Sequence, residues 1–116
     1  MTSDALYRLV FNEWKWCSCG QPWKALDLLR DVLLVLDART HSDKNWDESY
    51  DKLAAAVGAS ERYSRVEEFI LHQLDAWGLT EHGGSVGGCW LNDFGGEVLD
   101  SLIIHGCDPG QWIREA

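Results

Sequence analysis

Three cysteines and one histidine, near the two ends of the chain, have the side chains best suited to bind a metal. They are Cys17, Cys19, His105 and Cys107. Thiolate and imidazole are ligands that tetrahedral zinc prefers, so a C-terminal turn folded onto the first loop would complete a structural site. However, one residue separates Cys17 from Cys19, whereas zinc knuckles usually place about two to four between paired cysteines. The sequence therefore favours ordinary thiols and no cofactor, with zinc as the alternative.

His82 and Cys89 form a second pair with reactive side chains, on either side of a glycine-rich segment. Across a hairpin, an imidazole and a thiol could act as base and nucleophile. No third residue is placed to orient the histidine, and the glycines offer no evident substrate pocket. We therefore expect Cys89 to pack inward. No other set of catalytic residues is apparent, so the chain is expected not to be an enzyme.

Carboxylates dominate the second half of the chain. From Val66 to Ile113, 48 consecutive residues include no Lys or Arg but eight acids, and residues 66–116 carry a net charge of −8 out of the total −9. Nucleic acids and anionic membranes are poor partners for such a segment, whereas a basic protein surface is a suitable one. The acids that we predict to bind the partner are Glu67, Glu68, Asp75, Glu81, Asp93, Glu97 and Asp100.

The elements that must position these side chains are predicted from apolar periodicity and capping residues. The pattern predicts about five helices and one β-hairpin. The helices are Ser3 to about Trp14, Pro22 to about Ala38, Trp46 to Val57, a helix capped by Ser60 and ending at Trp77, and a last one capped by Asn92. The hairpin joins Leu79–His82 to Cys89–Leu91 through Gly83–Gly88, whose glycines are expected to make its tip flexible.

Helical spacing also predicts which side chains face the core. For the helix that ends at Trp77, the inward residues are Tyr63, Val66, Phe69, Ile70, Leu74 and Trp77. For the last helix they are Phe94, Val98, Leu99, Leu102 and Ile103. Trp46 is expected inside, and the helix that begins at Pro22 is expected to be central because apolar residues line two of its faces.

Length and composition predict one domain, residues 1–116, of the mainly α (α+β) class. The amino terminus lacks a secretory signal pattern, and the longest apolar run, Val32 to Leu36, is too short to cross a membrane. We therefore expect a cytoplasmic protein with no membrane partner.

The segment from Leu74 to Leu102 resembles the closing part of winged-helix domains in bacterial regulators. The matching positions are Gly78-Leu79, the Gly83–Gly88 connection and Leu91–Val98. The Cys-Ser-Cys-Gly-Gln-Pro loop at residues 17–22 and the stretch from Glu81 to Leu91 also look like small proteins of unknown function encoded by actinobacterial phages and prophages. The resemblance implies a winged-helix-like second half and the cytoplasm of a bacterial host.

Winged-helix domains that bind DNA carry basic residues on the recognition helix and the wing. Here, Arg62 and Arg65 are the only cations near the helix that ends at Trp77. We therefore do not expect direct DNA binding. The main hypothesis is an acidic protein-binding module that engages a basic surface of a host or defence protein. It would be a phage-encoded inhibitor of a nucleic-acid-binding protein, of the anti-defence, anti-CRISPR or DNA-mimic type.

Two other functions stay open: a winged-helix transcription regulator and a small zinc-stabilised structural protein. Seven tryptophans also leave a homodimer open, because tryptophan is enriched at interfaces.

Overall fold

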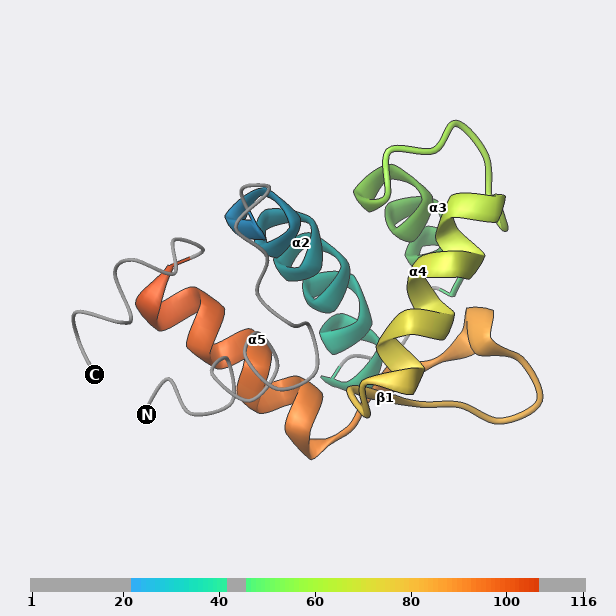
Figure 1. The fold of residues 1–116 in the computed structure, drawn as a ribbon. Helices are drawn as coiled ribbons and strands as arrows, with labels where there is room; N and C mark the ends of the chain where they lie inside the picture. The colour runs from blue at the N-terminus through green and yellow to red at the C-terminus, as the bar shows by residue number, and fades with distance from the viewer. Residues whose placement is uncertain (1–21, 42–45, 107–116) are drawn as a thin grey trace.

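Four α-helices and one antiparallel hairpin make up the described part of the computed structural model, residues 22–41 and 46–106 (Figure 1). The helices are α2 (Pro22–His41), α3 (Trp46–Ala56), α4 (Arg65–Ala76) and α5 (Asp93–His105). The strands β1 (Thr80–Glu81) and β2 (Trp90–Leu91) flank a short 3-10 helix, η2 (Val86–Gly88). The mainly helical prediction is confirmed, with four helices in place of about five. The helix predicted from Ser3 to Trp14 lies outside the described residues.

Helix α2 lies at the centre, with α5 on one side and α3 on the other (Figure 1). Its side chains Leu26, Val32, Leu33 and Leu36 are fully buried, and Leu28 and Val35 pack at the edge of the same core. The two apolar faces seen in the sequence are therefore both covered, as predicted. The core also receives Leu53 of α3, Leu71 and Leu74 of α4, and Val98, Leu99 and Leu102 of α5.

Helix α4 begins later than the sequence predicted. Its cap is Ser64, whose side chain accepts a hydrogen bond from the Glu67 N–H, so the prediction of Ser60 as the cap is wrong. Tyr63, just before the cap, has a φ of 59°, and Gly78 ends the helix with a φ of 77°. Glycine adopts such a left-handed conformation without strain, which explains Gly78 at this turn.

Asn92 ties the hairpin to both of the helices that it joins. Its side-chain oxygen accepts a hydrogen bond from Gly95 N–H at 2.8 Å and so caps α5, as predicted. Its side-chain nitrogen donates to the carbonyl of Gly78 at 2.7 Å, and its backbone N–H donates to Leu79. In the hairpin, Thr80 faces Leu91 and Glu81 faces Trp90. Glu81 and Trp90 are exposed, while Thr80 and Leu91 are buried.

The predicted inward face of α4 is partly wrong. Leu74 is buried as predicted, but Tyr63, Val66 and Phe69 are exposed, Phe69 by 71%. The reason is the position of the hairpin: η2 and β1 pack on α4, and the side that they cover carries Glu67, Leu71 and Leu74. Two other core predictions are also wrong, because Trp46 of α3 and Ile103 of α5 are exposed. No helix in the described ranges has both the length and the apolar character to cross a membrane.

Candidate partner-binding site

Six of the seven acids predicted to bind a partner are exposed. They are Glu68, Asp75, Glu81, Asp93, Glu97 and Asp100. The seventh, Glu67, differs from them, because its side chain is only 2% exposed. Helical geometry explains the difference: Glu67 is four residues before Leu71 and seven before Leu74, so it shares their inward face. Glu67 therefore does not belong to the exposed acidic surface.

Three of the exposed acids form a stripe along α5. Asp93, Glu97 and Asp100 are separated by four and three residues, a spacing that places them on one side of a helix. Val98, Leu99 and Leu102 occupy the opposite side and are buried. None of the three acids makes an ion pair with the part of the chain that the structure describes. We call these three residues the α5 acidic stripe.

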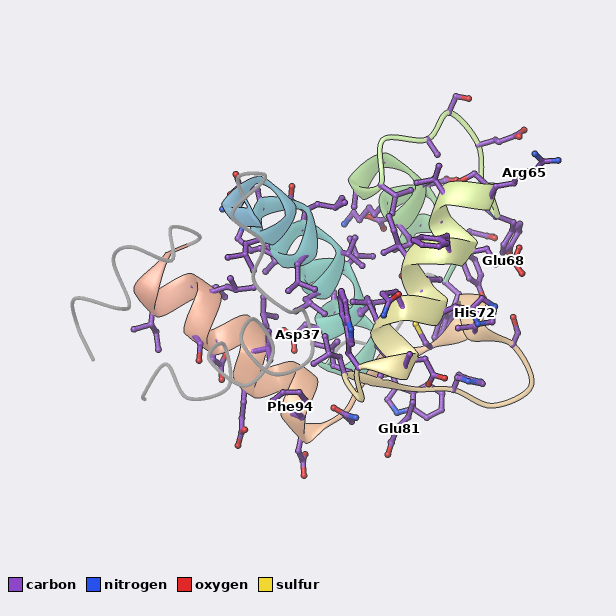
Figure 2. All side chains as sticks on the ribbon, in the orientation of Figure 1. Asp37, Arg65, Glu68, His72, Glu81 and Phe94 are labelled. Atoms are coloured by element: carbon purple, nitrogen blue, oxygen red, sulfur yellow. The ribbon has the colours of Figure 1, made fainter. Side chains whose placement is uncertain are left out.

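The other exposed acids lie on α4 and β1, and two of them are close to histidines. An oxygen of Glu68 is 3.7 Å from Nε2 of His72, and one of Asp75 is 3.6 Å from Nε2 of His82. Figure 2 shows Glu68 and His72 on the outer side of α4 and Glu81 beyond the end of that helix. Glu68 and Asp75 therefore each have an imidazole nearby, whereas no such neighbour is present for the acids of the α5 acidic stripe within the described residues.

Arg39, near the end of α2, connects three elements through its guanidinium. Nη1 donates hydrogen bonds to the carbonyls of Gly87 and Cys89, at 3.1 and 2.8 Å, and Nε donates to Ser49 Oγ at 2.6 Å. The guanidinium also lies over the rings of Trp46 and Tyr50. Burial lowers the pKa of Arg39, but the group stays charged because its ordinary pKa is so high. Arg39 thus holds η2 in position beside α4.

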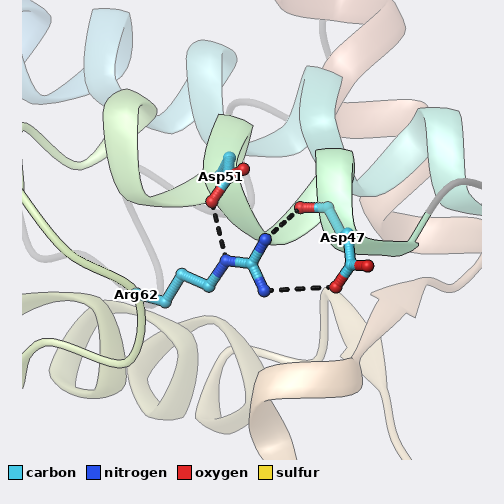
Figure 3. Close-up of polar contacts among 3 residues, drawn as sticks. All are labelled: Asp47, Asp51 and Arg62. Carbon is cyan, nitrogen blue, oxygen red and sulfur yellow. Dashed lines mark hydrogen bonds and ion pairs between the residues drawn. The ribbon is translucent and has the colours of Figure 1, made fainter.

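A row of aromatic side chains continues from this arginine towards α4. Trp46 packs against Tyr50, and Tyr50 packs against Tyr63, with ring centroids 5.9 and 5.5 Å apart. Arg62 adds an ion-pair network: its Nε donates to Asp51 at 2.7 Å and its two terminal nitrogens donate to Asp47 (Figure 3). These contacts attach the segment before α4 to α3 and so fix where the ring of Tyr63 lies.

A small pocket opens between α4 and η2. Its volume is about 240 Å³, and the residues that line it are Tyr63, Glu67, Glu68, Leu71, Ser85, Val86 and Gly87. Tyr63, Glu68 and Ser85 are exposed and form its rim, whereas Glu67, Leu71 and Gly87 are buried and form its base. We call this the α4–η2 pocket. Within the glycine-rich tip, whose flexibility stays a prediction, Gly87 belongs to η2 and is buried.

The base of this pocket carries an incompletely satisfied carboxyl group. Oε1 of Glu67 is buried and has no hydrogen-bond partner among the described residues. Burial raises the pKa of Glu67, while a hydrogen bond from the Tyr63 backbone and the charge of Arg39 act in the opposite direction. Buried polar atoms without partners are uncommon in folded proteins. Because Oε1 is closed to solvent, a ligand in the pocket could use this acceptor only if the carboxyl group turned towards it.

The other chemically active side chains are arranged as follows. Cys89 is fully buried, which confirms that it packs inward, and burial raises the pKa of its thiol to about 11. His82 is exposed, and its Nδ1 contacts the carbonyl of Gly83. A thiol in this environment is a poor nucleophile, because the thiolate is the reactive form.

The proposed zinc ligands fall outside what the structure describes. Cys17, Cys19 and Cys107 lie outside the described residues, as does the side chain of His105. Within residues 22–41 and 46–106, no three His, Cys, Asp or Glu side chains come together as metal ligands would. Zinc therefore stays an alternative that the sequence alone suggests.

Comparisons with protein-family models, curated proteins and solved structures returned no match for this chain.

Proposed function

We propose that this protein is a non-enzymatic, acidic binding module that engages a basic surface of another protein. The observation that carries the proposal is the α5 acidic stripe. Three exposed carboxylates follow one side of a helix, and no Lys or Arg occurs among the described residues from 66 to 106 to neutralise them. A basic partner would supply the cations that this surface lacks, and the complementary charges would speed association.

The partner that fits best is a nucleic-acid-binding protein of a bacterial host or its defence system. A protein that binds phosphates presents Lys and Arg on an exposed face, and that face is the natural counterpart of aligned carboxylates. An inhibitor of the DNA-mimic or anti-CRISPR type would occupy it in place of nucleic acid. Direct DNA binding by this chain is not part of the proposal, because the outer side of α4 carries Glu68 as well as Arg65 (Figure 2).

The apolar side chains next to the stripe support a protein partner. Ile103 and Ile104, near the end of α5, are 58% and 56% exposed. Ile104 is eleven residues after Asp93, so it continues the line of the stripe. Charge complementarity mainly raises the rate of association, whereas buried apolar anchors slow dissociation. A surface that combines the α5 acidic stripe with these exposed isoleucines suits a stable protein complex.

The test is affinity capture from a bacterial lysate with the wild-type chain and two double variants. Glu97→Lys/Asp100→Lys changes the stripe, and Asp27→Lys/Glu61→Lys makes the same change in net charge elsewhere. We leave Asp93 intact because an acid in the first turn stabilises α5. The proposal requires a basic protein that the wild type and the control variant capture and the stripe variant does not. Equal capture by all three would refute it.

A further inference from the structure

The α4–η2 pocket combines a suitable size, a negative charge and an aromatic wall. Its volume of about 240 Å³ is below the roughly 300–1,000 Å³ of typical small-molecule pockets, so it suits a single side chain better than a whole ligand. Glu67 and Glu68 are two carboxylates among its lining residues, and the charge of Arg39 acts on Glu67 from nearby. Two negative charges and one positive charge leave the pocket negative.

The aromatic wall is the ring of Tyr63, which is 61% exposed. Its position is fixed from two sides: the ring packs on Tyr50, and it lies next to the backbone of Gly87 in η2. An exposed tyrosine ring beside carboxylates suits a planar cation, because a guanidinium stacks on aromatic faces while its N–H groups donate to carboxylates. A lysine ammonium would have the charge but not the flat stacking surface.

We propose that the α4–η2 pocket receives an arginine side chain from the partner's basic surface, with Glu67 at its base, Glu68 at its rim and the Tyr63 ring against the guanidinium. This inference rests on the proposed function, since it names one residue type that the partner presents. Oε1 of Glu67 has no partner among the described residues but is closed to solvent in the unbound structure, so the proposal requires the carboxyl group to turn into the pocket and accept from the guanidinium. The pocket thereby adds a specific anchor to the general attraction of the α5 acidic stripe.

The probe for this proposal is N-acetyl-arginine methylamide, which needs no knowledge of the partner. It is titrated into the 15N-labelled full chain, and backbone amide shifts are followed by NMR. We expect saturable shifts at Tyr63, Glu67 and Ser85–Gly87 with the arginine compound, and weaker binding of its lysine counterpart. The citrulline counterpart, which has the same shape without the charge, is expected to give no saturable shift. Saturable citrulline binding, lysine binding as strong as that of arginine, or arginine shifts of equal size along α5 would overturn the proposal.

Glu67→Gln keeps the shape of the base and removes its charge. We expect the arginine compound to bind this variant about tenfold more weakly, because a charge-assisted hydrogen bond is replaced by a neutral one. Glu61→Gln, an exposed change outside the pocket, serves as the matched control and is expected to bind as the wild type does. If Glu67→Gln does not fold, Glu68→Gln is used, with an expected loss of about threefold for a rim charge. Unchanged binding by the folded pocket variant would overturn the proposal.

The basic partner of the α5 acidic stripe and the arginine in the α4–η2 pocket can be rejected independently. Absence of arginine binding, together with capture that depends on the α5 acidic stripe, would reject the pocket and keep the basic partner. Arginine binding together with stripe-independent capture would reject the stripe as the main surface.

Discussion

Nη1 of Arg39 donates a hydrogen bond of 2.8 Å to the carbonyl of Cys89, fifty residues later in the chain. The contact joins the end of α2 to the residue between η2 and β2, and a second one, to Gly87, holds η2 beside α4. The α4–η2 pocket therefore depends on a buried arginine that does not line it.

Arg39→Met should destabilise the protein by about 3 kcal/mol, because two buried carbonyls and Ser49 lose their donor. Arg39→Lys should recover only part of this loss, since lysine lacks both the forked donors and the stacking on Trp46 and Tyr50. Urea unfolding followed by circular dichroism measures the free energy of unfolding. Lys52→Met is the control, because Lys52 is exposed, and should change stability by no more than about 0.5 kcal/mol. Equal stabilities for Arg39→Met and the control would contradict the role given to Arg39.

Two neighbouring glycines of α5 should respond in opposite ways to alanine. A Cβ at Gly95 would run into the main-chain oxygen of Leu79, whereas one at Gly96 meets nothing within 4 Å. Gly95→Ala should therefore cost about 2 kcal/mol through overpacking, while Gly96→Ala should stabilise the helix by up to about 1 kcal/mol. Thermal unfolding of both variants measures the difference. If they shift the midpoint in the same direction, the close packing of α5 on the hairpin is wrong.

The ionisation of Glu67 should reduce stability at neutral pH. Burial raises its pKa above the ordinary value of 4.5, so the folded protein holds the proton more tightly than the unfolded chain does. This contribution to stability is complete below pH 4.5 and is lost as pH rises through the folded-state pKa. Glu67→Gln should remove that part of the pH dependence and leave the protein at least as stable as the wild type at pH 7. Urea midpoints across this pH range measure the effect, and a Gln variant much less stable at pH 7 would show that the carboxylate stabilises the fold.

Cys89 should be unreactive in the folded protein. Its thiol is fully buried and its pKa is raised to about 11, so only about one thiol in a thousand is ionised at pH 8. Treatment with iodoacetamide at pH 8, followed by peptide mapping, should find Cys89 unmodified until denaturant is added. Rapid modification of Cys89 in the native protein would contradict its burial and reopen the His82–Cys89 pair as a catalytic possibility.

The sequence predicted burial and capping well where the pattern within a single helix is sufficient. Helix α2 follows its apolar periodicity. Asn92 caps the start of α5 and Gly78 follows the end of α4, as capping rules predict. It was a poor guide on α4, where apolar character favours Val66 and Phe69 but the hairpin covers Glu67 instead. The position of η2 in the fold decides which of those faces is buried. That position cannot be inferred from the periodicity of α4 alone.

The residues that build the candidate pocket left weaker signals. Arg39 falls three residues after Leu36, so it continues an otherwise apolar buried face, and a cation at such a position indicates a buried polar contact. The spacing of Glu67 to Leu71 and Leu74 was also visible. The meeting of Tyr63 with Gly87, by contrast, joins segments whose approach no local pattern reveals.

The central claim is that the α5 acidic stripe binds a basic protein surface. Its most direct test is the dissociation constant of the captured partner for the wild type and for Glu97→Lys/Asp100→Lys, measured across a range of salt concentrations. We predict that affinity for the wild type falls as salt rises, and that the stripe variant binds at least about tenfold more weakly at low salt, while Asp27→Lys/Glu61→Lys stays close to the wild type. Equal affinities for the two double variants, or an affinity for the wild type that salt does not change, would contradict the claim.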